Sequence, residues 1–149
     1  MLERNRRPAA LLDAVLEANE AQIDRAETMV SQMGGQTIGM VGISFKTGTD
    51  DLRESPSLVL MEELIRYGAQ VSYHDPYVES IKETRSHPAL SGMRSVSLDD
   101  ATLTACDAVL IATAHTGIDY ARIVTKAPLV VDTRNATADC ASGNPKVVK

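Results

Sequence analysis

The chain has 149 residues, of which 44% are hydrophobic, and this length and composition predict one globular domain with a buried core. The net charge of −5 and the scarcity of aromatic side chains exclude a typical nucleic-acid-binding module, which needs a basic face and aromatic platforms. No run of about 18 apolar residues is present and no apolar segment follows the first positive charges, so we expect neither a membrane span nor a secretory signal, and a cytoplasmic location.

Residues 1–35 are predicted to form a long helix. Pro8 suits a first helical turn, apolar residues recur three or four positions apart from Leu12 to Met33, and Gly34 and Gly35 end the pattern. A helix of about 25 residues is roughly 38 Å long, which is more than a domain of this size covers. We therefore expect the apolar stripe to pack on a partner helix or another domain, with packing on its own core as the alternative.

From residue 36 onward, short apolar runs alternate with helix-forming segments. Such alternation predicts right-handed crossovers and a Rossmann-like, doubly wound parallel sheet covered on both faces. The domain is expected to span residues 36–149, with a tail that frays after about residue 136. Strands are predicted at 37–44, 70–74, 107–112 and 128–132, and helices at 56–67, 77–85, 98–105 and 118–126, with Ser55 and Ser97 as N-caps.

Two cations stand where a ligand is expected in this type of sheet, beyond the carboxyl ends of the strands. Lys46 directly follows the first strand and Arg134 directly follows the last, so both can lean over one crevice and bind a diphosphate with charge-assisted hydrogen bonds. Phe45, the only phenylalanine, lies beside Lys46. Arg53 precedes a helix start, where the helix dipole does not favour a cation, and is therefore predicted to bind a ligand or an ion-pair partner.

The loop after the first strand lacks the motifs that bind the phosphates of a dinucleotide. It is about ten residues long and contains Gly48 alone, instead of a tight G-x-G-x-x-G turn, and no Walker-type loop is present. We therefore do not expect independent NAD binding. His74, Asp75 and His115 are conceivable metal ligands near the sheet edge, but their spacing matches no known pattern and no metal is expected.

No catalytic group is predicted in this chain. Asp50 and Asp51 are adjacent and usually would point apart, so a structural role near the helix start is favoured for them and for Glu54 over acid–base work. Cys106 falls between a helix and a strand, is expected to be buried, and has no nearby base. Cys106 and Cys140 are too few for a disulfide framework and are expected to be reduced.

One segment carries a specific resemblance. Residues 42–56, Gly-Ile-Ser-Phe-Lys-Thr-Gly-Thr-Asp-Asp-Leu-Arg-Glu-Ser-Pro, strongly resemble the signature of the C-terminal, UDP-binding domain of the UDP-glucose/GDP-mannose dehydrogenase family. Residues 73–76 look like that family's second strand, and residues 132–134 like its final strand and ligand-binding arginine. The resemblance runs from about residue 8 to 136. Residues 70–76, 118–120 and 131–135 look closest to the UDP-N-acetylglucosamine and UDP-N-acetylmannosamine 6-dehydrogenases, and then to UDP-glucose enzymes.

The resemblance implies a reaction and a set of contacts. The family oxidises the C6 alcohol of a nucleotide sugar to a carboxylate, in two hydride transfers to NAD through a cysteine-bound thiohemiacetal, for polysaccharide biosynthesis. Phe45, Lys46 and Arg134 match positions that contact the nucleotide sugar, and Arg53 matches a position that reaches the NAD held by the other half of the enzyme. The first helix, with Asn19, resembles the central helix that joins the two halves and lies at a subunit interface, which implies a homodimer.

The chain also departs from the family pattern. The family's G-x-G-x-x-G domain and its catalytic cysteine segment are absent, and neither Cys106 nor Cys140 has a matching context. The resemblance therefore predicts a UDP-sugar-binding half-site of an NAD-dependent 6-dehydrogenase, inactive as an isolated chain. The alternative is a dimerisation module that associates through the first helix and keeps only a vestigial nucleotide pocket.

Overall fold

The computed structural model describes residues 36–66, 68–141 and 143–148. The predicted helix over residues 1–35, with its expected partner, lies outside the described residues. The elements follow one another as β1 (Thr37–Val41), α3 (Pro56–Arg66), β2 (Gln70–His74), the 3-10 helix η2 (Pro88–Leu90), α4 (Asp100–Ala105), β3 (Ala108–Ile111), α5 (Tyr120–Lys126), β4 (Val130–Asp132) and β5 (Val147–Val148).

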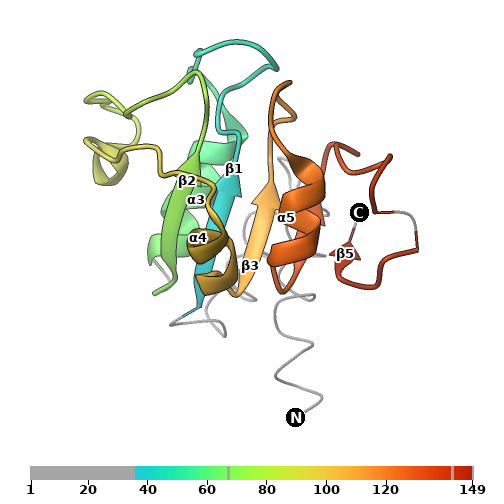
Figure 1. The fold of residues 1–149 in the computed structure, drawn as a ribbon. Coiled ribbons are helices and arrows are strands. Elements are labelled where there is room, and N and C mark those ends of the chain that lie inside the picture. The colour runs from blue at the N-terminus through green and yellow to red at the C-terminus, as the bar shows by residue number, and fades with distance from the viewer. Residues whose placement is uncertain (1–35, 67, 142, 149) are drawn as a thin grey trace.

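The five strands form one parallel sheet in the order β2-β1-β3-β4-β5, as Figure 1 shows. From β1 the chain moves outward to β2 and then returns to β3 on the other side of β1. The strand order therefore reverses between β1 and β3, and in sheets of this kind the carboxyl ends of two such strands frame a crevice. The predicted Rossmann-like parallel α/β fold is confirmed.

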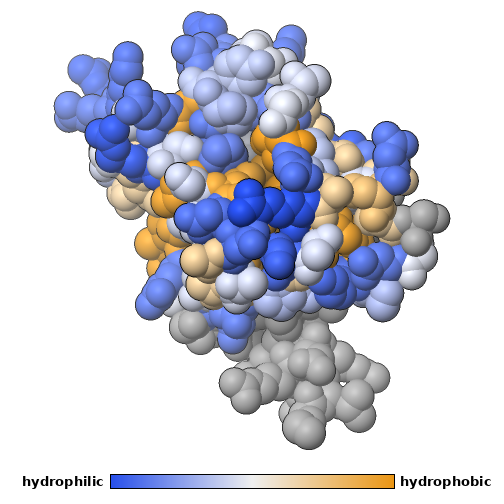
Figure 2. Space-filling view, in the orientation of Figure 1, coloured by the Kyte–Doolittle hydropathy of each residue, from blue (hydrophilic) through white to orange (hydrophobic). Residues whose placement is uncertain are grey.

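Helices cover both faces of the sheet, with α3 on one side and α4 and α5 on the other (Figure 1). The alternation of side chains along a strand explains the two cores. Met40 of β1 belongs to the cluster that contains Met61 of α3, whereas Val41 belongs to the cluster with Leu103 of α4 and Ile123 of α5. The outer surfaces of α4 and α5 are largely hydrophilic in Figure 2, as expected for helices that bury one side. None of the described helices is long and apolar enough to cross a membrane.

Gly42 allows β1 and β3 to approach closely at their carboxyl ends. Its φ angle is +78°, and a Cβ atom there would lie 2.2 Å from the carbonyl oxygen of Thr113. Any side chain at this position would force the two strand ends apart. Because the switch in strand order falls between these two strands, Gly42 helps to set the geometry of the crevice.

The helix predicted over residues 77–85 is wrong. Val78 and Ile81 are buried and have helical spacing, but this segment pairs with a later one instead. Ile81 N–H donates to the Met93 carbonyl, and an antiparallel bridge joins Ser80 to Arg94. These long-range bonds satisfy the backbone groups that a local helix would have used.

Two further expectations need correction. The side chain that caps α4 is Asp99, which accepts from Thr102 N–H, and not Ser97. The tail does not fray throughout its length, because Val147–Val148 forms β5 beside β4 and Lys146 Nζ donates to the carbonyls of Thr125 and Ala127 at the end of α5.

Pro56 begins α3 as predicted. The hydroxyl of Ser55, expected to cap that helix, donates instead to the Ile43 carbonyl at 2.7 Å, while the Ser55 carbonyl accepts from Leu58 N–H. The start of α3 is thus tied directly to the end of β1. This bond closes the loop that carries Lys46.

Candidate functional site

The loops that follow β1, β2 and β3 gather at one edge of the sheet, the upper edge in Figure 1. Lys46 and Arg134 are both exposed at the carboxyl ends of their strands. Their loops are linked through the residues that end β3. Thr113 Oγ1 donates to the Ser44 carbonyl at 2.6 Å, and Arg134 Nε donates to the carbonyl of the neighbouring Ala112 at 2.9 Å.

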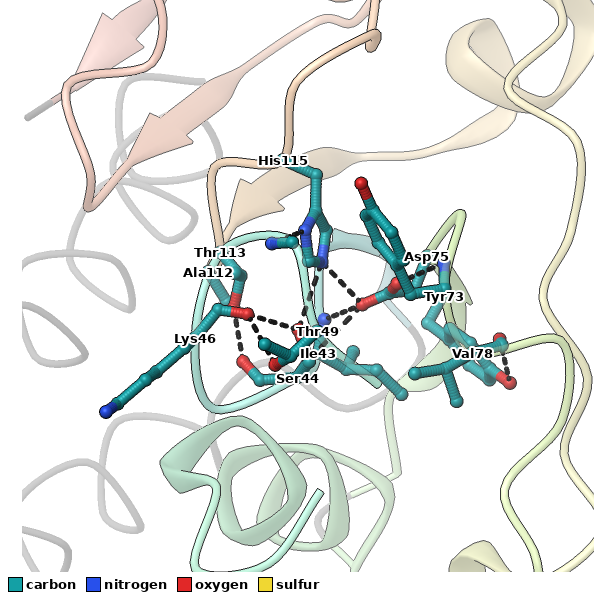
Figure 3. Close-up of polar contacts among 12 residues, drawn as sticks. Ile43, Ser44, Lys46, Thr49, Tyr73, Asp75, Val78, Ala112, Thr113 and His115 are labelled. Carbon is teal, nitrogen blue, oxygen red and sulfur yellow. Dashed lines mark hydrogen bonds and ion pairs between the residues drawn. The ribbon is translucent and has the colours of Figure 1, made fainter. Parts of the chain in front are cut away.

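Three buried polar side chains lie beneath the Lys46 loop (Figure 3). Ser44 follows β1, Asp75 follows β2 and His115 follows β3. His115 Nε2 lies 3.0 Å from both Ser44 Oγ and Asp75 Oδ2. The side chains of His115 and Asp75 are 0% exposed. We call these three residues the buried triad; it joins the ends of three strands at the switch in strand order.

The carboxylate of Asp75 also collects backbone donors. Its Oδ2 atom accepts from Ile43 N–H at 2.8 Å and Ser44 N–H at 3.3 Å, and its Oδ1 atom accepts from Tyr77 N–H at 2.8 Å. A buried carboxylate is stable only when its oxygens are satisfied in this way. Asp75 therefore fixes the point at which the chain leaves β1 relative to the point at which it leaves β2.

The Lys46 loop is held to the triad by two bonds. Gly48 N–H donates to His115 Nδ1 at 3.0 Å, and Ser44 Oγ donates to the Lys46 carbonyl at 3.1 Å. The Lys46 side chain extends away from the triad in Figure 3, and its Nζ atom lies 6.0 Å from the centre of the Phe45 ring. The loop thus holds the Lys46 ammonium outside the buried triad, whose hydrogen bonds fix the backbone of the loop.

A single carboxylate holds the Arg134 loop. Asp132 Oδ1 accepts from Arg134 N–H and Ala136 N–H, both at 3.0 Å, and Oδ2 accepts from the backbone and hydroxyl of Thr137 at 2.8 and 2.6 Å. Burial alone would raise the pKa of Asp132, but the hydrogen bonds from Thr137, Ala136 and Arg134 outweigh it and hold the pKa below its ordinary value of 3.8. Asp132 is therefore charged and organises the turn that carries Arg134.

Two aromatic side chains near the Lys46 loop and the triad are exposed. Phe45 is 43% exposed and Tyr77 is 44% exposed, which makes them the large hydrophobic side chains most open to solvent in the part of the chain that the structure describes. The Tyr77 ring lies 4.8 Å from the His115 ring, tilted by 49°. An apolar face beside cations suits a ligand that combines a flat ring with phosphates.

Arg53 is in an ion pair. Its Nε and Nη2 atoms contact the two oxygens of Asp51 at 3.0 and 3.1 Å, and the two side chains are 89% and 40% exposed. The side-chain hydrogen bond from Arg53 lowers the pKa of Asp51. In this structure Arg53 therefore binds Asp51, and a contact of Arg53 with a ligand stays a prediction.

The remaining chemical candidates have structural roles. His74 Nδ1 contacts the Val96 carbonyl at 2.7 Å, and within residues 36–66, 68–141 and 143–148 no group of three or more His, Cys, Asp or Glu is arranged to hold a metal ion. Cys106 is buried, as expected, and its burial raises the pKa of the thiol. A thiol of raised pKa is a poor nucleophile. Cys106 Sγ lies 3.0 Å from where a Cβ of Gly39 would be, so it fills space beside β1.

Sequence reasoning named Asp75 and His115 only as possible metal ligands and did not single out Ser44 or Thr113. A usable signal existed for Ser44, Thr113 and His115, because each is a polar residue that follows an apolar run of strand length. The rule that ligands bind at strand ends selects these loops. It does not reveal that the polar groups face inward and bind one another.

A parallel sheet with a switch in strand order and helices on both faces defines the class of Rossmann-like domains, to which this domain belongs. Residues 39–139 match the family model described as UDP-glucose/GDP-mannose dehydrogenase family, UDP binding domain. The chain therefore belongs to the UDP-glucose/GDP-mannose dehydrogenase family, as the segment 42–56 indicated.

Individual relatives agree with this assignment. A UDP-glucose 6-dehydrogenase of Pseudomonas aeruginosa is 38% identical over 111 residues, which cover 70% of this chain and 24% of that protein. A GDP-mannose 6-dehydrogenase of Azotobacter vinelandii is 41% identical over 75 residues, which cover 50% of this chain and 17% of that protein. The structure of a UDP-glucose dehydrogenase from Pyrobaculum islandicum is similar with a TM-score of 0.61 at 28% identity, over 92% of this chain and 31% of that one. The chain thus spans less than a third of the length of each of these relatives.

Proposed function

We propose that this domain binds the nucleotide diphosphate of a UDP-sugar at the carboxyl edge of its sheet. Lys46 and Arg134 would contact the diphosphate, and Phe45 would contact the nucleotide. The observation that carries the proposal is the link between the two cationic loops. The end of β3 binds the Lys46 loop through Thr113 and the Arg134 side chain through the Ala112 carbonyl.

Charge supports the same assignment. The chain is acidic overall, with a net charge of −5, so an anionic ligand needs a local group of cations. Lys46 follows β1 and Arg134 follows β4, on either side of the end of β3, and neither side chain belongs to an ion pair among the described contacts. If both cations reach one ligand, a diphosphate suits them better than a single phosphate, because each cation can contact a different phosphoryl group.

Titration of the full chain with UDP tests the proposal. We expect a dissociation constant of roughly 0.1–10 mM, because the domain supplies one side of a site. Amide shifts should concentrate at residues 44–49 and 133–136. Lys46→Ala and Arg134→Ala should each abolish measurable binding, whereas Lys126→Ala, which removes a lysine at the opposite edge where α5 ends, should leave it unchanged. Absence of shifts at millimolar UDP in the unaltered chain would overturn the proposal.

The choice of nucleotide is tested by the same titration. The resemblance favours UDP-N-acetylhexosamines over UDP-glucose, while relatives of this chain carry the names of both UDP-glucose and GDP-mannose 6-dehydrogenases. We expect UDP-N-acetylglucosamine and UDP-glucose to bind about as well as UDP, because this domain holds the nucleotide, and GDP to bind more weakly. Equal binding of GDP and UDP would show that the domain does not distinguish uracil from guanine.

We further propose that the domain works within an NAD-dependent dehydrogenase that oxidises the sugar C6 alcohol to a carboxylate, assembled as a homodimer. In that enzyme Arg53 would exchange its bond to Asp51 for a contact to NAD held by another domain. The isolated chain is expected to be inactive, since it carries no G-x-G-x-x-G loop and no cysteine in the family's catalytic context. Reduction of NAD by the pure chain with any UDP-sugar would contradict this.

A further inference from the structure

His115 is the most deeply buried ionisable side chain near the proposed ligand, and the proposed contacts do not include it. Its side chain is 0% exposed, so it has no surface on which to touch a nucleotide. Yet its ring contacts groups from two separate segments: Ser44 and Gly48 in the segment after β1, and Asp75 after β2. A side chain in this position acts on a ligand only through its neighbours.

The partners of the ring determine its proton. A backbone N–H only donates, so Nδ1 of His115, which faces Gly48 N–H at 3.0 Å, must be the unprotonated acceptor. The single proton of the neutral ring is then on Nε2, directed at the Asp75 carboxylate and Ser44 Oγ. Ser44 Oγ accepts in part from that proton and donates its own to the Lys46 carbonyl. The arrangement is consistent only for the neutral ring with its proton on Nε2.

The imidazole therefore holds the Lys46 turn at two points, directly at Gly48 and through Ser44 at the Lys46 carbonyl. The other bonds of the turn are local, from Thr49 N–H and Oγ1 to the Lys46 carbonyl and from Phe45 N–H to Asp51. Gly48 has a φ angle of +76°, and a Cβ there would have no neighbour within 4 Å, so packing contributes little at this position. The bond to His115 is what ties the tip of the turn to the sheet.

We propose that His115 is a positioning residue that pre-orders the Lys46 loop for an anionic ligand, by accepting the Gly48 N–H at Nδ1 while its Nε2–H is fixed by Asp75. The inference rests on the proposed function of the site. Without this anchor the loop would have to be ordered when the ligand binds, and that loss of conformational freedom weakens affinity.

Two substitutions separate the two sides of the ring. The amide oxygen of Asn lies near the position of Nδ1, so His115→Asn keeps an acceptor for Gly48. The amide nitrogen of Gln reaches the position of Nε2, so His115→Gln keeps the donor to Asp75 and loses the acceptor for Gly48. Tyr73→Phe is the matched control, because it removes another fully buried side-chain donor, which binds the Val78 and Met93 carbonyls away from the loop.

The first measurement uses the full chain without ligand. Nitrogen chemical shifts of His115 should show Nδ1 unprotonated and Nε2 protonated, and exchange of the Gly48 amide hydrogen should be slow. Exchange at Gly48 should accelerate in His115→Gln, return toward the original rate in His115→Asn, and stay unchanged in Tyr73→Phe. A protonated Nδ1, or equal Gly48 exchange in all variants, would overturn the inference.

The second measurement is UDP affinity in the variants that remain folded. We expect about tenfold weaker binding for His115→Gln and about threefold for His115→Asn, with the amide shifts of the Arg134 loop unchanged. Ser44→Ala, which leaves the ring and Asp75 in place, should weaken UDP binding about threefold. This variant replaces the His115 variants in the test if they do not fold. If His115→Gln shows fast exchange at Gly48 and unchanged UDP affinity, the positioning role is wrong while the proposed function stands. If the unaltered chain does not bind UDP, the proposed function itself is wrong.

Discussion

The two cationic loops of the site are built in opposite ways. Most hydrogen bonds of the Arg134 loop are local, since all four bonds to Asp132 come from residues two to five positions later, and Thr133 and Arg134 add bonds to the Ile111 and Ala112 carbonyls. The Lys46 loop is organised by residues far away in the chain. His115 lies 71 residues from Ser44 and 67 from Gly48, and Asp75 lies 32 from Ile43. Equivalent positions at the ends of parallel strands thus depend on local order in one case and on the completed sheet in the other.

Because of this difference, we expect the two loops to lose their order at different stages when tertiary contacts are weakened. A local turn re-forms whenever its few residues are ordered, so the Arg134 loop should survive partial loss of tertiary contacts. The Lys46 loop requires β1, β2 and β3 to be in place, because the three residues of the buried triad lie in the segments that follow these strands. Loosening of the sheet should therefore disorder Lys46 before Arg134.

The largest expected effect is from Asp75→Asn. The carboxamide cannot accept bonds at both ends, so its NH₂ group would face buried N–H groups of Ile43 and Ser44 or of Tyr77. Leaving buried donors unpaired at the junction of two strands should lower the free energy of unfolding by about 3 kcal/mol in denaturant titrations. Asp50→Asn, an exposed acid on the Lys46 loop, is the control and should have no measurable effect. Equal stability of both variants would show that the triad does not hold the loop.

Asp132→Asn should have the next largest effect, about 2 kcal/mol, because it disturbs bonds within a single turn. The pKa of Asp132 is lowered in the folded state, so its charge stabilises the fold above the ordinary value of 3.8, and this contribution is lost as the pH falls through the folded pKa. Unfolding experiments at a series of pH values should show a shallower decline below about pH 4 for the variant than for the unaltered chain. Parallel curves would contradict the assignment of a charged Asp132.

A matched pair of threonines compares the loops directly. Thr113→Val removes the bond to the Ser44 carbonyl, which is buried, and Thr133→Val removes the bond to the Ile111 carbonyl, which is partly buried. Valine keeps the shape of threonine, so the lost hydrogen bond dominates, and we expect about 1 kcal/mol for Thr113→Val and about 0.5 kcal/mol for Thr133→Val. Hydrogen exchange should increase at residues 45–49 only in Thr113→Val. The reverse order of stability would break the contrast between the loops.

The smallest effect is expected at the exposed ion pair of Arg53 and Asp51. Surface ion pairs contribute little, because water solvates both charges well. Asp51→Asn should leave the unfolding midpoint unchanged, although it frees the Arg53 guanidinium. Carboxyl carbon shifts in the unaltered chain should place the pKa of Asp51 below the ordinary value of 3.8, since the side-chain bond from Arg53 favours the charged form. A clear loss of stability would mean that this pair supports the Lys46 loop.

Several features follow from local sequence. The parallel sheet was predictable because apolar runs of strand length alternate with capped helices, and the exposed cations were predictable because each directly follows a strand. The Asp132 turn is local too, as an acid followed by small polar residues can bind the next backbone donors without help from the rest of the chain. Each of these features depends on residues within a few positions of one another.

Other features were decided by tertiary contacts. Residues 77–85 have a helical spacing of apolar residues, yet pairing with residues 92–95 determines their conformation. The tail forms β5 because β4 offers it an open edge. His115 and Asp75 read as possible metal ligands in the sequence, and the folded sheet makes them the anchor of the Lys46 loop. Local sequence thus predicts the alternation of the first four strands with helices and the exposed cations, whereas the partners of His115 and Asp75 depend on strand ends brought together from distant parts of the chain.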